Sequence, residues 1–487
     1  MSPDRPDPIA TRPGAPGRLL LLVLVTGLGL NCALIHPLRN TLPDFRGYYA
    51  AGQALHHGVD PYDVDAVRTT APLPGSATIV PYFYPPPTLA LFYVISLLPY
   101  AVAQVVWGVL QYTLLLASLA LLLQATRCPL GSPTTVLIAF VFLTSASVQQ
   151  LFFWGQFDML PLLLLAAAFT TLHTRRPGWA GALIGAAAVA KVTPLLCIGV
   201  LLLRRERRAL MTAILTIALS MGLALAVLGP ATTASWWHSL GAFSRDLPTL
   251  FSPTNMSLQA WLYRTLVNHP ANTIAPVWNL GLPGATLLAR TLIAATIIIT
   301  AVWMLRRRRA LTSAECLAVA VPVVQLASPV TWPHHGVLLL IPLVLAVTTV
   351  MNGPRLRPLH AVWLTAILLL YINAPLQQFG LTPPAWIAHL AGPTTTYATT
   401  LLWLFLVTQY VPLKQAAGLS EQRNGAPAST PAQANHPRPR CTPTQPNTTT
   451  ERTVPTRLPE PTPTNAPIAD APITDAPIAN APMTKAP

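Results

Sequence analysis

The chain has 487 residues, of which 52% are hydrophobic and only 9% are charged. Soluble domains carry about 25% charged residues, so this composition excludes an ordinary soluble globular protein. The formal net charge of +15 comes from short basic clusters between apolar runs, such as residues 204–208 and 306–309. Basic residues retained on the cytoplasmic side of a membrane give this pattern. Because no basic surface is interleaved with aromatic residues, we expect no nucleic-acid partner.

Apolar runs recur along the chain, and each is long enough to cross a bilayer core of roughly 30 Å as a helix. The sequence therefore predicts an all-α, polytopic membrane protein with about twelve transmembrane helices. The expected spans are residues 18–36, 86–99, 101–124, 134–152, 157–173, 179–203, 209–229, 286–304, 311–327, 336–350, 359–373 and 395–412. An even number places both termini in the cytoplasm, and the loops 37–85, 230–285, 328–335 and 374–394 on the non-cytoplasmic face of the plasma membrane.

Composition divides the chain into three parts. We expect residues 1–17 to be a disordered cytoplasmic N-terminus and residues 18–413 to form the membrane domain, whose first span is a signal anchor that is retained. Residues 414–487 are rich in Pro, Thr and Ala and end in a five-residue repeat that runs from Ala466 to Asn480. With so few large apolar side chains this tail cannot offset its ordering entropy, so it is predicted to be disordered and cytoplasmic.

A lone carboxylate, Asp44, lies just past the first apolar run and is followed by Tyr48 and Tyr49. The stretch has helical character that ends near Gly58. A carboxylate held at a membrane face is a candidate general base, and two tyrosines beside it suit contacts to a sugar or a lipid headgroup. The alternative is a helix-capping aspartate within an interfacial aromatic belt.

Lys191 interrupts an otherwise apolar run, three residues before Pro194. A lysine inside an apolar segment is costly and indicates a functional site, whose natural partner is an anion such as a lipid-linked phosphate. The alternative is a lysine that extends its ammonium to the membrane surface. Because Arg127 and Arg175 break the charge rule, we also expect a broken or re-entrant pair of helices within residues 125–203.

Two further loops carry polar candidates. Asn255 and Ser257 are expected to donate hydrogen bonds, and Arg264 is expected to make a second contact to an anion. The alternative for these three is a helix cap and a surface arginine. Paired histidines, His334 and His335, indicate proton handling or phosphate contact, or else an interfacial structural role.

Metal-binding patterns are weak. The five cysteines show no CxxC or Cys/His spacing, so neither a zinc site nor a disulfide framework is predicted. Asp63 and Asp65 form a DxD pattern, but two aspartates in a polar loop are usually just solvated. The pair His334 and His335 has no third Cys, His or acidic residue at ligand spacing. We therefore predict no metal and no cofactor.

Taken in order, these segments resemble glycosyltransferase family 87, the polyprenol-phosphate-mannose-dependent α-mannosyltransferases of the GT-C class. The resemblance runs from Asp44 to His335. Its elements are Asp44 with Tyr49-Ala50-Ala51, Gly58 to Tyr62, Tyr84-Pro85-Pro86, Leu98-Pro99 with Trp107, Gly155-Gln156, Gly181 to Lys191 with Pro194, Asn255 with Ser257 and Arg264, and Ser328-Pro329 with Trp332, His334 and His335. One departure is Asp158, where the resemblance leads us to expect asparagine more often.

The resemblance implies a GT-C-like helical bundle with non-cytoplasmic juxtamembrane loops. It implies transfer of a sugar, with inversion, from a polyprenyl-phosphate donor to a glycolipid or glycan acceptor, and Asp44 matches the catalytic aspartate. We assign donor-phosphate binding to Lys191, Arg264, His334 and His335. We assign sugar or acceptor binding to Tyr48, Tyr49, Gln156, Asn255, Ser257 and Trp332.

The chemistry of the residues agrees with this interpretation. A polyprenyl phosphate leaves as a stable anion, so one base suffices where glycoside hydrolysis needs two carboxylates. Two alternatives stay open. One is transfer of a pentose, arabinofuranose, from a polyprenyl phosphate; the other is a transporter or lipid flippase, although no internal repeat between the halves supports it.

Overall fold

The computed structural model describes residues 15–32, 38, 42–70, 73, 79–351, 358–372 and 394–416. All regular structure within these ranges is helical, which confirms the predicted all-α class. Apart from residues 15–17 and 414–416, which are helical, the predicted disordered termini lie outside the described residues. The predicted loop 374–394 lies outside them as well, except for residue 394.

Five helices among the described residues are long and apolar enough to cross a membrane. They are α6 (Tyr100–Ala125), α7 with α8 (Pro133–Thr144 and Ala146–Trp154), α12 (Arg207–Phe243), α15 (Gly281–Arg306), and η4 with α17 (Pro333–Leu339 and Leu340–Met351). Shorter apolar helices are α1 (Ala15–Leu30), η2 with α5 (Pro86–Thr88 and Leu89–Ile95), α9 (Met159–His173), α10 (Pro177–Ala190), η3 with α11 (Thr193–Cys197 and Ile198–Arg204), α16 (Ser313–Ala327) and α18 (Pro358–Ile372). The remaining helical elements are α3 (Pro43–His56), α4 (Val64–Thr70), α13 (Leu247–Phe251), α14 (Leu258–Leu266), α20 (Thr394–Phe405) and η6 (Leu406–Tyr410). A helical membrane protein is therefore shown, and the total of twelve spans stays a prediction.

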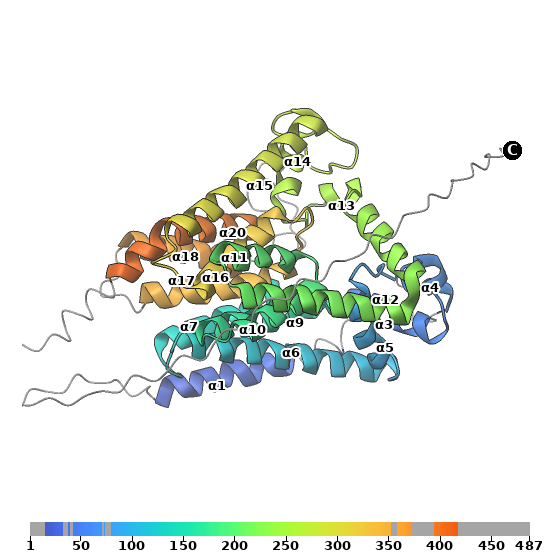
Figure 1. Ribbon diagram of the computed structural model, residues 1–487, viewed down its shortest axis with the longest axis horizontal. Coiled ribbons are helices and arrows are strands. Elements are labelled where there is room, and N and C mark those ends of the chain that lie inside the picture. Colours follow the sequence, from blue (N-terminus) through green and yellow to red (C-terminus); the bar gives the residue numbers. More distant parts are fainter. Residues whose placement is uncertain are drawn as a thin grey trace, which may run out of the picture. The chain divides into compact units, whose positions relative to one another are not determined.

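Four helices, α6, α9, α10 and α12, lie side by side in that order (Figure 1). Small residues let α10 and α12 approach closely. A Cβ atom added at Gly181 would collide with the Ala209 carbonyl oxygen, and one added at Gly185 would lie 2.6 Å from the Ala213 carbonyl oxygen. Small residues four positions apart are the usual means of bringing membrane helices into backbone contact. Within this row, Lys191 directly follows the end of α10.

Helix α12 differs from the sequence prediction. Its span was expected to end at residue 229 and to give way to an outer loop, but the helix continues to Phe243. Gly229, with φ of 83°, breaks the helical geometry, and Pro230 directly after it starts a second helical segment. Proline suits the first position of a helix because its fixed φ is already helical. The expected loop 230–285 is thus largely helical, with α13 and α14 following.

The predicted interruption at Lys191 is confirmed. Helix α10 ends at Ala190, Lys191 has extended geometry (φ −149°, ψ 134°), and η3 begins at Thr193. The predicted span 179–203 is therefore two helices with a break between them. A second break, at Ser145, separates α7 from α8. Breaks of this kind bring polar backbone and side chains to the lining of a cavity.

The first loop folds as predicted into a helix, α3, which ends at His56 just before Gly58. Helix α3 packs on α5 and α6 through its aromatic residues. Phe45 stacks on Trp107 with ring centroids 5.2 Å apart, and Tyr48 contacts Phe92 at 4.9 Å. Buried aromatic pairs of this kind add about 0.5–1.5 kcal/mol each beyond the area they bury. They fix α3, and with it Asp44 in its first turn.

Candidate active site

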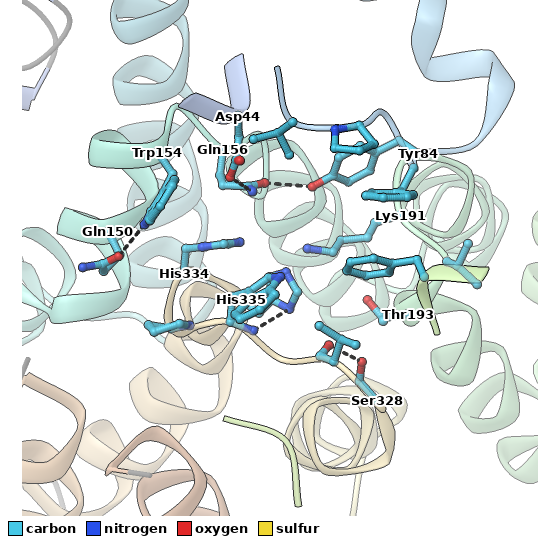
Figure 2. Close-up of a pocket in the computed structure, with 18 of the residues that line it drawn as sticks. Asp44, Tyr84, Gln150, Trp154, Gln156, Lys191, Thr193, Ser328, His334 and His335 are labelled. Carbon is cyan, nitrogen blue, oxygen red and sulfur yellow. Dashed lines mark hydrogen bonds between the residues drawn. The ribbon is translucent and has the colours of Figure 1, made fainter. Parts of the chain in front are cut away.

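A cavity of about 910 Å³ lies where α3, α8, the C-terminal end of α12 and the segment before η4 meet. Its lining is mostly apolar, and its polar side chains include Asp44, Gln156, Lys191, His334 and His335. The residues lining it are Asp44, Tyr48, Val80, Pro81, Phe83, Tyr84, Pro85, Gln149, Gln150, Phe153, Trp154, Gln156, Lys191, Val192, Thr193, Leu240, Phe243, Ser244, Thr254, Ser328, Pro329, Val330, Trp332, Pro333, His334 and His335. Figure 2 shows Lys191, His334 and His335 converging on the space beside Asp44 and Gln156.

One wall of the cavity is a hydrogen-bond network centred on Gln156. The Gln156 amide nitrogen donates to Asp44 Oδ2. Its carbonyl oxygen accepts from the Tyr48 hydroxyl at 2.7 Å and from the Tyr84 hydroxyl at 2.8 Å. Two donors on the oxygen hold the amide in one orientation. The network therefore aims the nitrogen at Asp44.

The environment of Asp44 shifts its proton affinity. Burial raises the pKa of the Asp44 carboxyl to about 7, and the Asp158 carboxylate adds to the rise. The hydrogen bond from Gln156 and the charge of Lys191 act in the opposite direction. A carboxyl whose pKa lies near neutrality exchanges its proton readily at physiological pH, which suits a general base.

A second polar group faces Asp44 across the cavity. Lys191 forms an ion pair with Oδ1 of Asp158, which is fully buried at the start of α9. His334 Nε2 lies 3.9 Å from the other oxygen of Asp158, and the His334 and His335 rings pack edge to face. The cavity thus has a carboxyl group on one side and nitrogen-bearing side chains on the other.

Residues 82–329 of this chain match the model of glycosyltransferase family 87. The chain belongs to glycosyltransferase family 87. It is 26% identical over 417 residues to a polyprenol-phosphate-mannose-dependent α-(1-2)-phosphatidylinositol pentamannoside mannosyltransferase of Mycobacterium tuberculosis (strain CDC 1551 / Oshkosh), covering 81% of this chain and 88% of the relative. It is 25% identical over 367 residues to a polyprenol-phosphate-mannose-dependent α-(1-2)-phosphatidylinositol mannoside mannosyltransferase of the strain ATCC 25618 / H37Rv, covering 72% of this chain and 81% of that relative. The chain is therefore a glycosyltransferase, which decides against the transporter alternative.

Six of the predicted site residues of this family 87 protein lie in the cavity wall besides Asp44. They are Tyr48, Gln156, Lys191, Trp332, His334 and His335. Residues more than 280 positions apart in the sequence are thus brought to one place. The order of the segments indicated a shared site, and the structure supplies their relative geometry.

Four other predicted residues do not line the cavity: Arg264, Asn255, Ser257 and Tyr49. Arg264 Nη1 donates to the backbone oxygens of Ser252 at 2.6 Å and Asn255 at 2.9 Å. Asn255 Nδ2 and Ser257 Oγ both donate to Pro329 O, at 3.3 and 2.9 Å. These bonds use the donors that were assigned to phosphate and sugar. Asn255 and Ser257 instead anchor the segment that carries Pro329, and Arg264 holds the backbone at Ser252 and Asn255.

Tyr49 and the DxD pattern also lie apart from the cavity. The Tyr49 hydroxyl donates to Leu98 O at 2.7 Å, which ties α3 to the segment after α5. Asp63 accepts from two backbone N–H groups at the start of α4, and the exposed Asp65 pairs with Arg68. Both aspartates have ordinary surface partners, as the solvated interpretation of the pattern expects.

Asp158 and Tyr84 belong to the site, although the sequence analysis assigned neither of them a role there. Asp158 is the more consequential of the two. It was singled out only as a departure from the expected asparagine. The available signal was a carboxylate at the very start of an apolar run, next to the Gly155-Gln156 pair. Its charge neutralises Lys191, which stands 33 positions further along. The positive charge of Lys191 is therefore balanced by the negative charge of Asp158.

Proposed function

We propose that this chain transfers mannose, with inversion, from a polyprenyl-phosphate donor to a glycolipid or glycan acceptor on the non-cytoplasmic face of the membrane. Asp44 is the general base in this proposal. The observation that carries it is the position of Asp44 in the wall of a largely apolar cavity, opposite Lys191, His334 and His335 (Figure 2).

The reaction needs only the groups that the cavity holds. The acceptor oxygen forms a bond to the anomeric carbon of the donor sugar and gives its proton to Asp44. The bond between that carbon and the phosphate oxygen breaks, and its electron pair stays on the phosphate. Because the polyprenyl phosphate is a stable anion, no acid has to protonate it. Lys191 and the histidines stand where its charge develops.

The cavity lining has both polar and apolar side chains, which fits an amphipathic donor. The polar group suits the sugar phosphate, and the apolar part suits the first isoprene units of the lipid. Phe83 and Phe243 stack with ring centroids 4.3 Å apart in the apolar part. Burying apolar surface contributes about 25 cal/mol per Å², so a lipid chain held there adds substantially to donor affinity.

The sidedness follows from charge. The cavity meets α12 at Leu240 to Ser244, whereas Arg207 and Arg208 begin the same helix. The segment of α12 before the break at Gly229, residues 207–228, is about 33 Å long at 1.5 Å per residue, so it can cross the roughly 30 Å hydrocarbon core. Since basic residues favour the cytoplasmic side, the cavity end of α12 belongs to the opposite face.

The donor sugar and the acceptor come from the relatives. Both relatives carry names that specify polyprenol-phosphate mannose as donor and a phosphatidylinositol mannoside as acceptor. The shared family and the cavity chemistry support the same donor class for this chain. A mannosylated glycolipid of the cell envelope is the corresponding acceptor class.

The test compares membranes that contain the wild-type chain or Asp44→Asn, incubated with radiolabelled polyprenyl-phosphate mannose. We expect the variant to lose at least about 10²-fold in transfer, since a positioned base contributes about 10²–10⁴-fold. A parallel incubation with polyprenyl-phosphate arabinofuranose tests the donor sugar. Asp65→Asn is the matched control, because Asp65 is exposed and does not line the cavity.

Wild-type turnover in a normally folded and inserted Asp44→Asn protein would overturn the assignment of the base. Label transferred from the arabinofuranose donor alone would overturn the assignment of mannose. Transfer from neither donor, with the wild-type chain folded, would overturn the proposed donor class.

A further inference from the structure

Three side chains that commonly bind metals converge behind the polar end of the cavity. Asp158 comes from the start of α9, and His334 and His335 come from η4. Each offers one ligand atom, and the three atoms lie within 4.8 Å of one another. Asp158 and His334 are buried, with exposed fractions of 0% and 3%. The fold thus provides the third ligand that the sequence spacing lacked.

Several atoms of this cluster are buried without a hydrogen-bond partner. Among the described residues, Asp158 Oδ2 and both ring nitrogens of His334 have none. A buried polar atom without a partner costs roughly 1–3 kcal/mol. The two ring nitrogens of His334 point in different directions, so one ligand can satisfy Asp158 Oδ2 together with one of them.

We infer that Asp158, His334 and His335 bind one divalent transition-metal ion, for which Zn²⁺ is the best fit. In a tetrahedral site with metal–ligand bonds of about 2.0–2.2 Å, two ligand atoms lie about 3.3–3.6 Å apart. The 3.9 Å between Asp158 Oδ2 and His334 Nε2 therefore has to shorten by a few tenths of an ångström for one ion to bind both atoms. Two imidazoles and one carboxylate favour Zn²⁺ over Mg²⁺ and Ca²⁺, which take oxygen ligands.

His335 needs a small adjustment to complete the set. Its Nδ1 accepts the backbone N–H of Trp332 at 3.3 Å, a long hydrogen bond. Such a bond is weak, so the ring can reorient towards the ion at little cost. Asp158 and His334 are accordingly the principal ligands.

Lys191 supports this site instead of competing for it. Its ammonium bonds the other carboxylate oxygen of Asp158, Oδ1, and leaves Oδ2 free. Carboxylates that bind metals usually have such an outer partner, which orients them. The charges of Asp158 and Lys191 cancel, so the ion would give the site two net positive charges. His334 and His335 line the cavity, so the open coordination position faces it.

This inference rests on the proposed function for its role in the reaction. The donor phosphate carries one negative charge, and the polyprenyl phosphate that leaves carries about two near neutral pH. The ion would bind a phosphate oxygen and stabilise the electron pair that the breaking bond leaves there. Its charge matches that of the leaving group, while the acceptor proton still goes to Asp44.

The test measures metal binding directly. The full-length chain is purified in nanodiscs without a histidine tag, stripped with a chelator, dialysed against Zn²⁺ and analysed for metal content. We expect one Zn²⁺ per chain, and with Co²⁺ we expect visible absorption bands of a site with nitrogen ligands. His334→Ala should weaken binding by at least about tenfold, as even changes around metal ligands cost 10–100-fold.

His360→Ala is the matched control, because His360 is a buried histidine whose Nε2 lies 3.1 Å from Gln409 Oε1, away from the cavity. It should bind Zn²⁺ like the wild type. Since His334→Ala could unfold the protein, His334→Gln is measured beside it, and thermal unfolding with and without Zn²⁺ reports on each. Zn²⁺ should raise the unfolding temperature of the wild type and not that of either His334 variant.

A wild-type chain that retains no Zn²⁺, or His334 variants that are folded and bind it equally, would overturn the inference. The proposed function and the metal site can be tested independently of each other. If Asp44→Asn abolishes mannose transfer while the wild type binds no metal, the function stands and the metal site does not. If Zn²⁺ binds as expected but no polyprenyl-phosphate sugar is used, the metal site stands and the function does not.

Discussion

Gln156 donates a hydrogen bond to Asp44 across 112 positions of sequence. Because an ionised carboxylate only accepts hydrogen bonds, the Gln156 amide turns its nitrogen to Asp44, and its oxygen accepts from the Tyr48 and Tyr84 hydroxyls. The donor on Oδ2 favours the ionised carboxylate, against the effect of burial. The network therefore tunes the protonation of Asp44 in addition to positioning it.

The first prediction concerns pH. Burial raises the pKa of Asp44 to about 7, and a base acts only when it is deprotonated. Transfer should therefore be slow at acidic pH, rise through a midpoint near 7 and level off at higher pH. Initial rates of mannose transfer at saturating donor, measured across this range, check the expectation. A profile that is flat across neutrality, or that falls with rising pH, would contradict it.

The second prediction concerns Gln156→Leu. Removing the donor from the ionised form of Asp44 should raise its pKa further, because hydrogen bonds to charged groups contribute about 1.5–3 kcal/mol and 1.36 kcal/mol corresponds to one pKa unit. The midpoint of the pH profile should move up by about one to two units. Gln111→Leu is the control, since Gln111 is buried but does not line the cavity. An unchanged midpoint in Gln156→Leu, with reduced rate only, would mean that the glutamine acts on the substrate.

The third prediction concerns the Asp158–Lys191 pair. Removing one partner of a buried ion pair leaves an uncompensated charge and costs about 3–5 kcal/mol. Asp158→Asn and Lys191→Met should each lower the unfolding temperature. The double variant should recover much of that loss, because it buries no charge. Thermal unfolding of the four proteins in detergent gives the coupling, and additive losses would show that the pair is not coupled in the folded protein.

Local sequence pattern predicted those parts of the site that depend on local structure. The helix after Asp44 and the break at Lys191 follow from periodicity and from the cost of a lysine in an apolar run. Local pattern did not predict that Asp158 is the partner of Lys191, because an ion pair across 33 positions depends on how α9 and α10 pack. Arg264 is expected to contact an anion because of its charge, yet in the folded chain it donates to the backbone carbonyls of Ser252 and Asn255. Pattern gives the residue type, and tertiary packing decides the partner.

The last prediction concerns Gly155, which follows α8 in the left-handed region with φ of 68°. A Cβ atom there would lie 2.7 Å from Phe45 Cβ and 2.9 Å from Leu42 Cβ. Gly155→Ala should therefore strain the backbone and also push away the start of α3, which carries Asp44. We expect both the unfolding temperature and the transfer rate to fall.

Gly58→Ala separates these two effects. Gly58 has the same φ of 68°, but no atom lies within 4 Å of its added Cβ. It should show only the backbone strain, about 1 kcal/mol, with transfer nearly unchanged. The difference between the two variants measures the cost of displacing α3 from the end of α8. Equal losses of stability and of transfer in both would show that the close approach of Phe45 to Gly155 does not hold Asp44 in place.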